Sequence, residues 1–173
     1  CHTMSSGASS TFGTASSTML MLLATGSLNG LDVDETTVGA KIFRIDARDN
    51  VERVAPPAMF GNGIANGFFN PLNQYMWRFG VQRGKLYVGT FDARILLDTF
   101  GAAAGITMPT LINPAGFDMY STTNGISWFP ESLNGFNDKF NYGGRSFVTD
   151  PRTGTLYLGT ANPFYGFQIW RKL

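Results

Sequence analysis

The first two residues of the sequence carry its most reactive side chains. Cys1 is the only cysteine and His2 is the only histidine. A terminal cysteine can act as a nucleophile with its own α-amine as the base, and self-cleavage can generate such a terminus. The pair could also ligate a metal or end a haem-attachment sequence. The alternatives without chemistry are a terminus left by trimming or processing, and a lipid-modified cysteine.

A second group of candidate ligands is acidic. Asp32, Asp34 and Glu35 follow Asn29 in a predicted loop, and oxygen ligands at alternate positions suit Ca²⁺. The spacing does not complete a calcium-loop motif, so a solvated acidic turn is the favoured interpretation. Calcium is the one cofactor that these residues suggest, and the sequence leaves the question of cofactors otherwise open.

A candidate ligand site consists of repeated residues near the starts of two predicted strands: Asn73, Tyr75, Arg78, Asn141, Tyr142 and Arg145. Arginine is suited to carboxylates, so these residues could bind an anionic or sugar ligand. Trp77 and Phe164 would add stacking surface to that of the two tyrosines. The structural alternative is that the repeated residues cap and cross-link neighbouring repeats. Trp128 and Trp170 are predicted to be core residues.

The composition narrows the class of protein. Of the 173 residues, 43% are hydrophobic and 14% are charged, which indicates a globular chain. The 21 glycines separate short runs that are rich in aromatic and β-branched residues, and this pattern predicts an all-β fold. The net charge is +1 without a basic cluster, so the sequence has no electrostatic footprint for nucleic-acid binding.

The sequence also bears on location. No apolar run approaches the roughly 20 residues of a membrane helix, so we expect no transmembrane segment. The single cysteine excludes a disulfide within the chain. Abundant Ser, Thr, Asn and Gly with few Lys and Glu favour an extracytoplasmic location, whether secreted, periplasmic or surface-attached.

One short pattern organises the chain. Its copies are Leu-Tyr-Val-Gly-Thr at 86–90, Leu-Tyr-Leu-Gly-Thr at 156–160 and, more faintly, Met-Leu-Leu-Ala-Thr at 21–25. A loop and a second apolar run follow each copy. The repetition predicts a unit of four strands, complete at 75–130 and present with three strands each at 18–57 and 142–173, behind a flexible low-complexity arm at 1–17.

A turn in the middle unit resembles that of a known family. Residues 121–128, Ser-Thr-Thr-Asn-Gly-Ile-Ser-Trp, resemble the Asp-box turn of sialidase-like β-propellers, which reads Ser-x-Asp-x-Gly-x-x-Trp. Thr123 departs from this pattern, because it stands at the position of the aspartate. The resemblance implies a β-propeller, in which each four-stranded unit is one blade. It implies little about activity, since propellers host many functions.

The predicted strands amount to about two and a half blades, whereas propellers usually need at least four to close. We therefore expect a C-terminal partial propeller that is completed by another chain, either the rest of a processed precursor or further copies of this chain. The long connections fall on one face of such a ring.

The expected function is a ligand-binding or interaction module of an extracytoplasmic propeller, with a carbohydrate-like or surface ligand on the long-loop face. The alternative is a processed propeller hydrolase, with Cys1 as its nucleophile or with catalytic groups on the partner chain.

Overall fold

The computed structural model describes residues 39–55, 66–70, 72–103 and 114–172. These residues form nine strands and two short helical segments, so the fold is mostly β. Several predictions concern residues outside this part of the chain: Cys1, His2, Asp32, Asp34, Glu35, the arm at 1–17 and the first repeat copy at 21–25.

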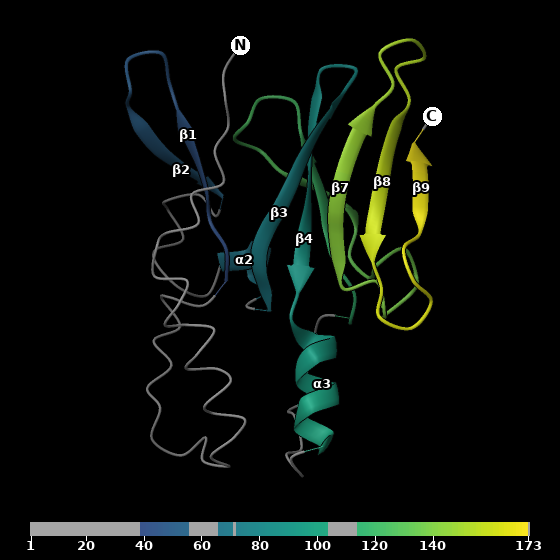
Figure 1. The fold of residues 1–173 in the computed structure, drawn as a ribbon. Helices are drawn as coiled ribbons and strands as arrows, with labels where there is room; N and C mark the ends of the chain where they lie inside the picture. Colours follow the sequence, from purple (N-terminus) through teal and green to yellow (C-terminus); the bar gives the residue numbers. More distant parts are fainter. Residues whose placement is uncertain (1–38, 56–65, 71, 104–113, 173) are drawn as a thin grey trace, which may run out of the picture.

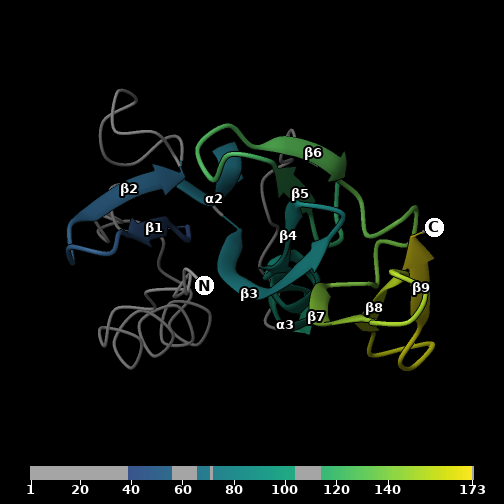
Figure 2. The ribbon, with the colours of Figure 1, turned by 90° about the horizontal axis from the view of Figure 1, so that it is seen from above.

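The strands form two sheets in which all neighbours are antiparallel. The smaller sheet is a hairpin of β1 (Ile42–Ile45) and β2 (Val51–Ala55). The larger sheet contains β3 (Asn73–Gln82), β4 (Lys85–Asp92), β5 (Met119–Thr122), β6 (Phe129–Ser132), β7 (Gly143–Thr149), β8 (Leu156–Ala161) and β9 (Ile169–Lys172). This larger sheet curls into a half-barrel (Figure 2).

The pairing of strands divides the larger sheet into two meanders. Strands β3 to β6 pair in chain order, and so do β7 to β9. A single bridge between Phe91 and Gly143 joins the two groups. We call the β1–β2 hairpin, the β3–β6 meander and the β7–β9 meander the first, second and third units.

The two ends of the strands differ (Figure 1). The tight β1–β2, β3–β4 and β7–β8 turns lie at one end, whereas α2 (Asn66–Phe69) and α3 (Arg94–Ala103) lie at the other. Helix α3 follows β4 along the chain. It begins where Asp92 Oδ1 accepts the backbone N–H of Arg94 at 2.8 Å, as an N-cap acceptor does. We call the end that carries α2 and α3 the loop-bearing end.

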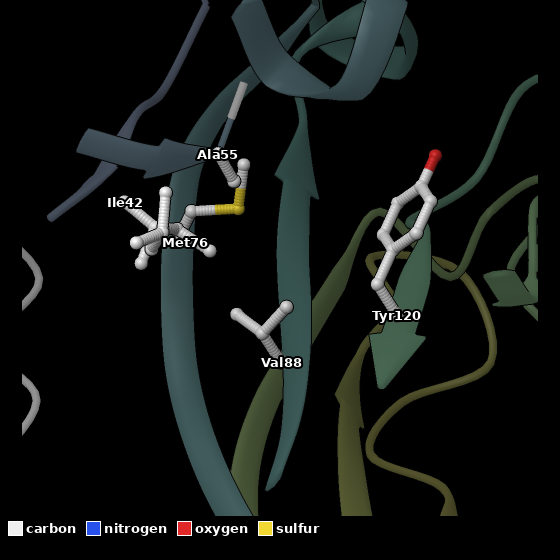
Figure 3. Close-up of a cluster of buried hydrophobic side chains, with 6 residues drawn as sticks. Ile42, Ala55, Met76, Val88 and Tyr120 are labelled. Carbon is white, nitrogen blue, oxygen red and sulfur yellow. The ribbon is translucent and has the colours of Figure 1, made fainter. Parts of the chain in front are cut away.

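Two apolar clusters hold the three units together. The first cluster joins the first and second units and contains Ile42, Val54, Ala55, Met76, Val88 and Tyr120 (Figure 3). The second joins the second and third units and contains Tyr87, Phe117, Met119, Leu156 and Leu158. A fully buried side chain of this kind contributes about 1.5–3 kcal/mol. Because each cluster takes residues from two units, no unit buries its apolar face alone.

Strands β4 and β7 approach closely at two glycines. A Cβ atom on Gly89 would lie 2.7 Å from the carbonyl oxygen of Gly144, and a Cβ atom on Gly144 would lie 2.9 Å from the Cα of Gly89. Such contacts leave no room for a side chain on either strand. The glycine of the repeated Leu-Tyr-Val-Gly-Thr pattern is therefore the point where the next unit crosses.

The turn between β5 and β6 is stabilised by side chains other than the one expected at the Asp-box aspartate. Thr122 Oγ1 accepts the N–H of Gly125 at 2.9 Å. Asn124 Oδ1 accepts the next two backbone N–H groups, at 2.9 and 2.8 Å. Thr123 is exposed, and Trp128 packs against the first apolar cluster, as expected of a core residue.

The second and third units correspond without a gap from residues 66–81 to 134–149. Asn73 is equivalent to Asn141, and both strands bulge at the same place, after Met76 and after Gly144. Arg145 is therefore equivalent to Trp77 and not to Arg78. The expectation that the two arginines share one repeat position is wrong by one residue, because the strand registers leave no gap between the two units.

Candidate functional site

Four aromatic side chains meet where β3, β4 and β7 come together at the loop-bearing end. The ring of Phe91 lies 5.0 Å from Tyr75, 5.3 Å from Trp77 and 5.6 Å from Tyr142, measured between centroids. These contacts are edge-to-face, a favoured arrangement of aromatic pairs. All four rings are half-buried, so each keeps part of its surface accessible. We call these four residues the aromatic cluster.

Arg145 adds a positive charge to the aromatic cluster. Its guanidinium carbon lies 5.3 Å from the centroid of the Trp77 ring, within the range of a cation–π contact. The absence of a side chain on Gly143 makes room for this indole, because a Cβ atom there would lie 2.2 Å from Trp77 Cζ3. A guanidinium beside partly exposed rings can pair with a carboxylate while the rings contact an apolar ligand face.

The six predicted ligand residues separate into three groups. Three of them belong to this site: Tyr75, Tyr142 and Arg145. Arg78 is exposed on β3, where its register partner is Gly89. Phe164, predicted to supply stacking surface, instead packs at 4.4 Å against Phe140 in a separate aromatic pair.

Asn73 and Asn141 are completely buried, and both side chains bond inside the protein. Asn73 Nδ2 donates to the carbonyl of Gly67 at 2.8 Å and to Asp118 Oδ2 at 2.6 Å. Its Oδ1 accepts the hydroxyl of Thr90 at 2.7 Å. These bonds give Asn73 a positioning role that matches the structural alternative for the repeated residues.

Asn141 makes similar bonds in the third unit, with the two equivalent partners for its Nδ2 and a different donor to its Oδ1. Its Nδ2 donates to the carbonyl of Gly135 at 2.9 Å and to Gln168 Oε1 at 3.0 Å. Its Oδ1 accepts from Asn162 Nδ2 at 3.0 Å. The two asparagines therefore do the same work in two successive units.

Each asparagine holds a left-handed turn. Residues 67–69 and 135–137 all have φ between 59° and 67°, and the first residue of each turn is a glycine. The other residues of the turns bear side chains, for which this conformation costs roughly 1–2 kcal/mol each. The asparagine Nδ2 bonds to the glycine carbonyl and so stabilises the turn. We call segments 66–73 and 134–141, each a turn with its asparagine, the two clasps.

Two buried carboxyl groups lie beside the first clasp. Burial raises the pKa of Asp118 to about 6, although hydrogen bonds from Asn73 and Asn70 favour its charged form. Burial also raises the pKa of Asp92 to about 6; the backbone N–H groups of Arg94 and Gly116 lower it, and the charge of Asp118 raises it further. Raised pKa values of this kind are typical of acid–base catalysts as well as of structural networks.

The third unit distinguishes these two roles. Gln168 stands at the position of Asp118, and Asn162 at that of Asp92. Gln168 bonds to Asn141 and to Asp138, and Asn162 Oδ1 accepts the N–H groups of the two residues that open the next loop. Amides fill the places of Asp118 and Asp92 in this hydrogen-bond network, in which the carboxylate of Asp138 stands at the position of Asn70. Because neither place requires a carboxyl group, we assign Asp118 and Asp92 a structural role.

Sequence reasoning missed Asp92, Asp118 and Phe91. The available signal was the echo of Gly-Phe-Asp at 116–118 in Gly-Phe-Gln at 166–168, which marks a repeated polar position. Trp170, predicted to be core, packs against Phe136 at 4.8 Å but keeps more than a third of its surface exposed.

A scan against protein-family models and searches of curated proteins and of solved structures found no match for this chain. Among the residues that the structure describes, no helix is long and apolar enough to reach across a bilayer. In the same part of the chain, no three His, Cys, Asp or Glu side chains gather as metal ligands. The assignment of the candidate site therefore rests on the geometry of its residues.

Proposed function

We propose that this chain is a ligand-binding module of a propeller-like repeat protein, and that the aromatic cluster with Arg145 binds a carbohydrate-like ligand. One observation carries the proposal: the cluster gathers half-buried rings and an exposed guanidinium from two units at the loop-bearing end. The ring faces suit the apolar face of a sugar, and the guanidinium suits a carboxylate. A sugar acid is thus the first ligand to test.

The arrangement of the units supports the architectural part of this proposal. Successive antiparallel units that share mixed apolar clusters along a curled sheet are compatible with successive propeller blades. Three units, one of them a hairpin among the described residues, are fewer than a closed ring needs. We therefore propose that another chain completes the ring, and that the assembly is extracytoplasmic.

The test is direct binding of glycans to the full chain. An oligosaccharide of uronic acids and the neutral oligosaccharide of the same length and linkage would each be titrated by isothermal calorimetry. We expect the acidic ligand to bind more tightly, and Arg145→Gln to remove that preference. Trp77→Ala should weaken the binding of both ligands by roughly tenfold, which corresponds to the loss of one stacking contact.

Two variants serve as matched controls. Phe164→Ala removes an exposed ring from the separate aromatic pair, and Arg152→Gln removes an exposed arginine in the β7–β8 turn. Neither should change the affinity. The proposal fails if neither ligand binds, or if the control variants weaken binding as much as the variants of the cluster.

A further inference from the structure

The third unit exposes the face that the second unit buries. In the second unit, the residues that face the third are Tyr87, Phe117 and Met119, with 2%, 0% and 4% of their surface exposed. The equivalent residues of the third unit are Tyr157, Phe167 and Ile169, with 36%, 63% and 69% exposed. An apolar face of this kind on a repeat protein marks a surface made for a neighbour.

The backbone beside this face also differs from its counterparts in the first two units, which bond a clasp. Phe117 donates its N–H to the carbonyl of Asn141 at 2.7 Å and accepts the N–H of Gly135 at 2.9 Å, so it bonds the second clasp on both sides. Ala40 makes the same two bonds with the first clasp, at 2.9 Å each. Within the described residues, Phe167 at the equivalent position bonds no clasp.

The contacts between the first and second units and between the second and third units show what kind of segment would fit the exposed face of the third unit. Each clasp reads Asn-Gly-x-x-(Asn/Asp)-x-x-Asn. Six residues after the last asparagine, a phenylalanine packs against the apolar cluster between the units: Phe79 against the first cluster and Phe147 against the second. The full pattern occurs twice in the 173 residues, at 66–79 and 134–147. Both copies are already bound inside the chain, so a second copy of the chain has no unused clasp among them.

We propose that the face formed by Tyr157, Phe167 and Ile169 binds a further unit, carried by another polypeptide segment, whose clasp reads Asn-Gly-x-x-(Asn/Asp)-x-x-Asn. The proposal rests on the repeat architecture proposed above and names the partner that completes it. It is independent of the ligand at the aromatic cluster, which lies at the junction on the other side of β7.

Docking requires one local rearrangement. The ring of Phe167 covers Gly159, where a Cβ atom would lie 2.2 Å from Phe167 Cζ. In the second unit the backbone of Gly144 covers the equivalent Gly89 instead. An incoming strand would therefore displace the Phe167 ring and take its place over Gly159.

A peptide copy of residues 134–149 tests the proposal, since it carries a clasp and the strand that follows. Its binding to the full chain would be measured by biolayer interferometry. We expect the peptide to bind, and we expect Asn141→Ala or Phe147→Ala in the peptide to weaken binding at least roughly tenfold. In the chain, Ile169→Asp should do the same, whereas Val51→Asp, an exposed apolar position on β2, should not.

A tethered form removes the difficulty that a short peptide is unfolded. The same segment would follow residue 173 through a flexible linker, which raises its effective concentration to about the millimolar range. The fusion should melt at a higher temperature than the chain alone, and the Asn141→Ala copy in the tether should abolish the increase.

Three results would overturn the inference. They are no binding in either format, equal binding by the Asn141→Ala segment, and self-association of the chain that Ile169→Asp abolishes without any peptide binding. The last result would make a second copy the occupant. Glycan binding by the Ile169→Asp variant keeps the two proposals apart, because that variant leaves the aromatic cluster unchanged.

Discussion

Replacing Asp118 with asparagine should remove part of the pH dependence of this protein's stability. Asp118 Oδ2 accepts hydrogen bonds from Asn73 at 2.6 Å and from Asn70 at 3.4 Å. An amide oxygen can accept the same two bonds, so Asp118→Asn keeps the network and removes the charge. In the third unit the network forms with an amide at this position, since Gln168 bonds both Asn141 and Asp138.

The size of the expected change in the free energy of unfolding follows from the pKa of Asp118. Burial raises the pKa of Asp118 from 3.8 to about 6, a difference equivalent to about 3 kcal/mol at 1.36 kcal/mol per unit. A raised pKa means that the folded protein holds this proton more tightly than the unfolded chain does. The contribution to stability is therefore complete below about pH 4 and is lost as the pH rises to about 6. Asp92, whose pKa burial also raises to about 6, adds a loss of the same sign.

Urea unfolding at fixed protein concentration, at several pH values between 4.5 and 7.5, would measure this effect. The free energy of unfolding of the wild type should fall with pH, and that of Asp118→Asn should fall less steeply. The difference between the two should change by about 2 kcal/mol across the range, most of the full 3 kcal/mol. Gln168→Glu is the mirror variant: it adds a carboxyl to the third unit and should steepen the fall.

A stability that rises with pH over this range would refute the reasoning, because it would mean that the hydrogen bonds to Asp118 outweigh its burial. An unchanged slope in Asp118→Asn would refute it as well, since the charge of that residue would then have no measurable cost.

Three further changes test the scaffold by urea unfolding. Asn141→Ala should cost about 2–4 kcal/mol, because it leaves buried groups of the second clasp without partners; a loss below 1 kcal/mol would contradict this role. Gly144→Ala should cost about 1–3 kcal/mol through the clash with β4, whereas Gly154→Ala, which has open space at a positive φ, should cost about 1 kcal/mol. Glu131→Gln breaks partly exposed ion pairs to two lysines and should cost less than about 1 kcal/mol, a difference that 1 M salt removes.

Strand positions could be predicted from the sequence because glycine turns separate apolar runs. The boundaries of β5 could not be predicted, because the apolar run that follows the Leu-Tyr-Val-Gly-Thr pattern, at 116–121, begins before the strand does. Gly116 has φ of 107°, and Phe117 bonds the clasp of the next unit and not the neighbouring strand. Strand β5 therefore begins only at Met119. This boundary depends on a contact with a segment that is distant in the sequence.

The polar network was harder to predict for a similar reason. A carboxylate is ordinarily expected on the surface, and nothing local to Asp92 or Asp118 indicates that burial. Asp118 is buried where Asn70 and Asn73 of the first clasp bond it. Asp92 is buried where it accepts two backbone N–H groups, those of Arg94 and Gly116. The asparagines were found because they recur, but recurrence alone did not distinguish a ligand site from a structural one.

The repeated residues of this chain have structural roles, and the candidate ligand site is formed by residues that do not recur. The clasps and the glycine that precedes Thr90 or Thr160 occur in both meanders, and they hold units together. The aromatic cluster does not recur: the positions of Tyr75, Trp77 and Phe91 are taken in the third unit by Gly143, Arg145 and Ala161. A residue required by the scaffold should recur at each junction, whereas a ligand site needs to form at one. The non-recurring cluster is thus a stronger candidate for the ligand site than the repeated asparagines.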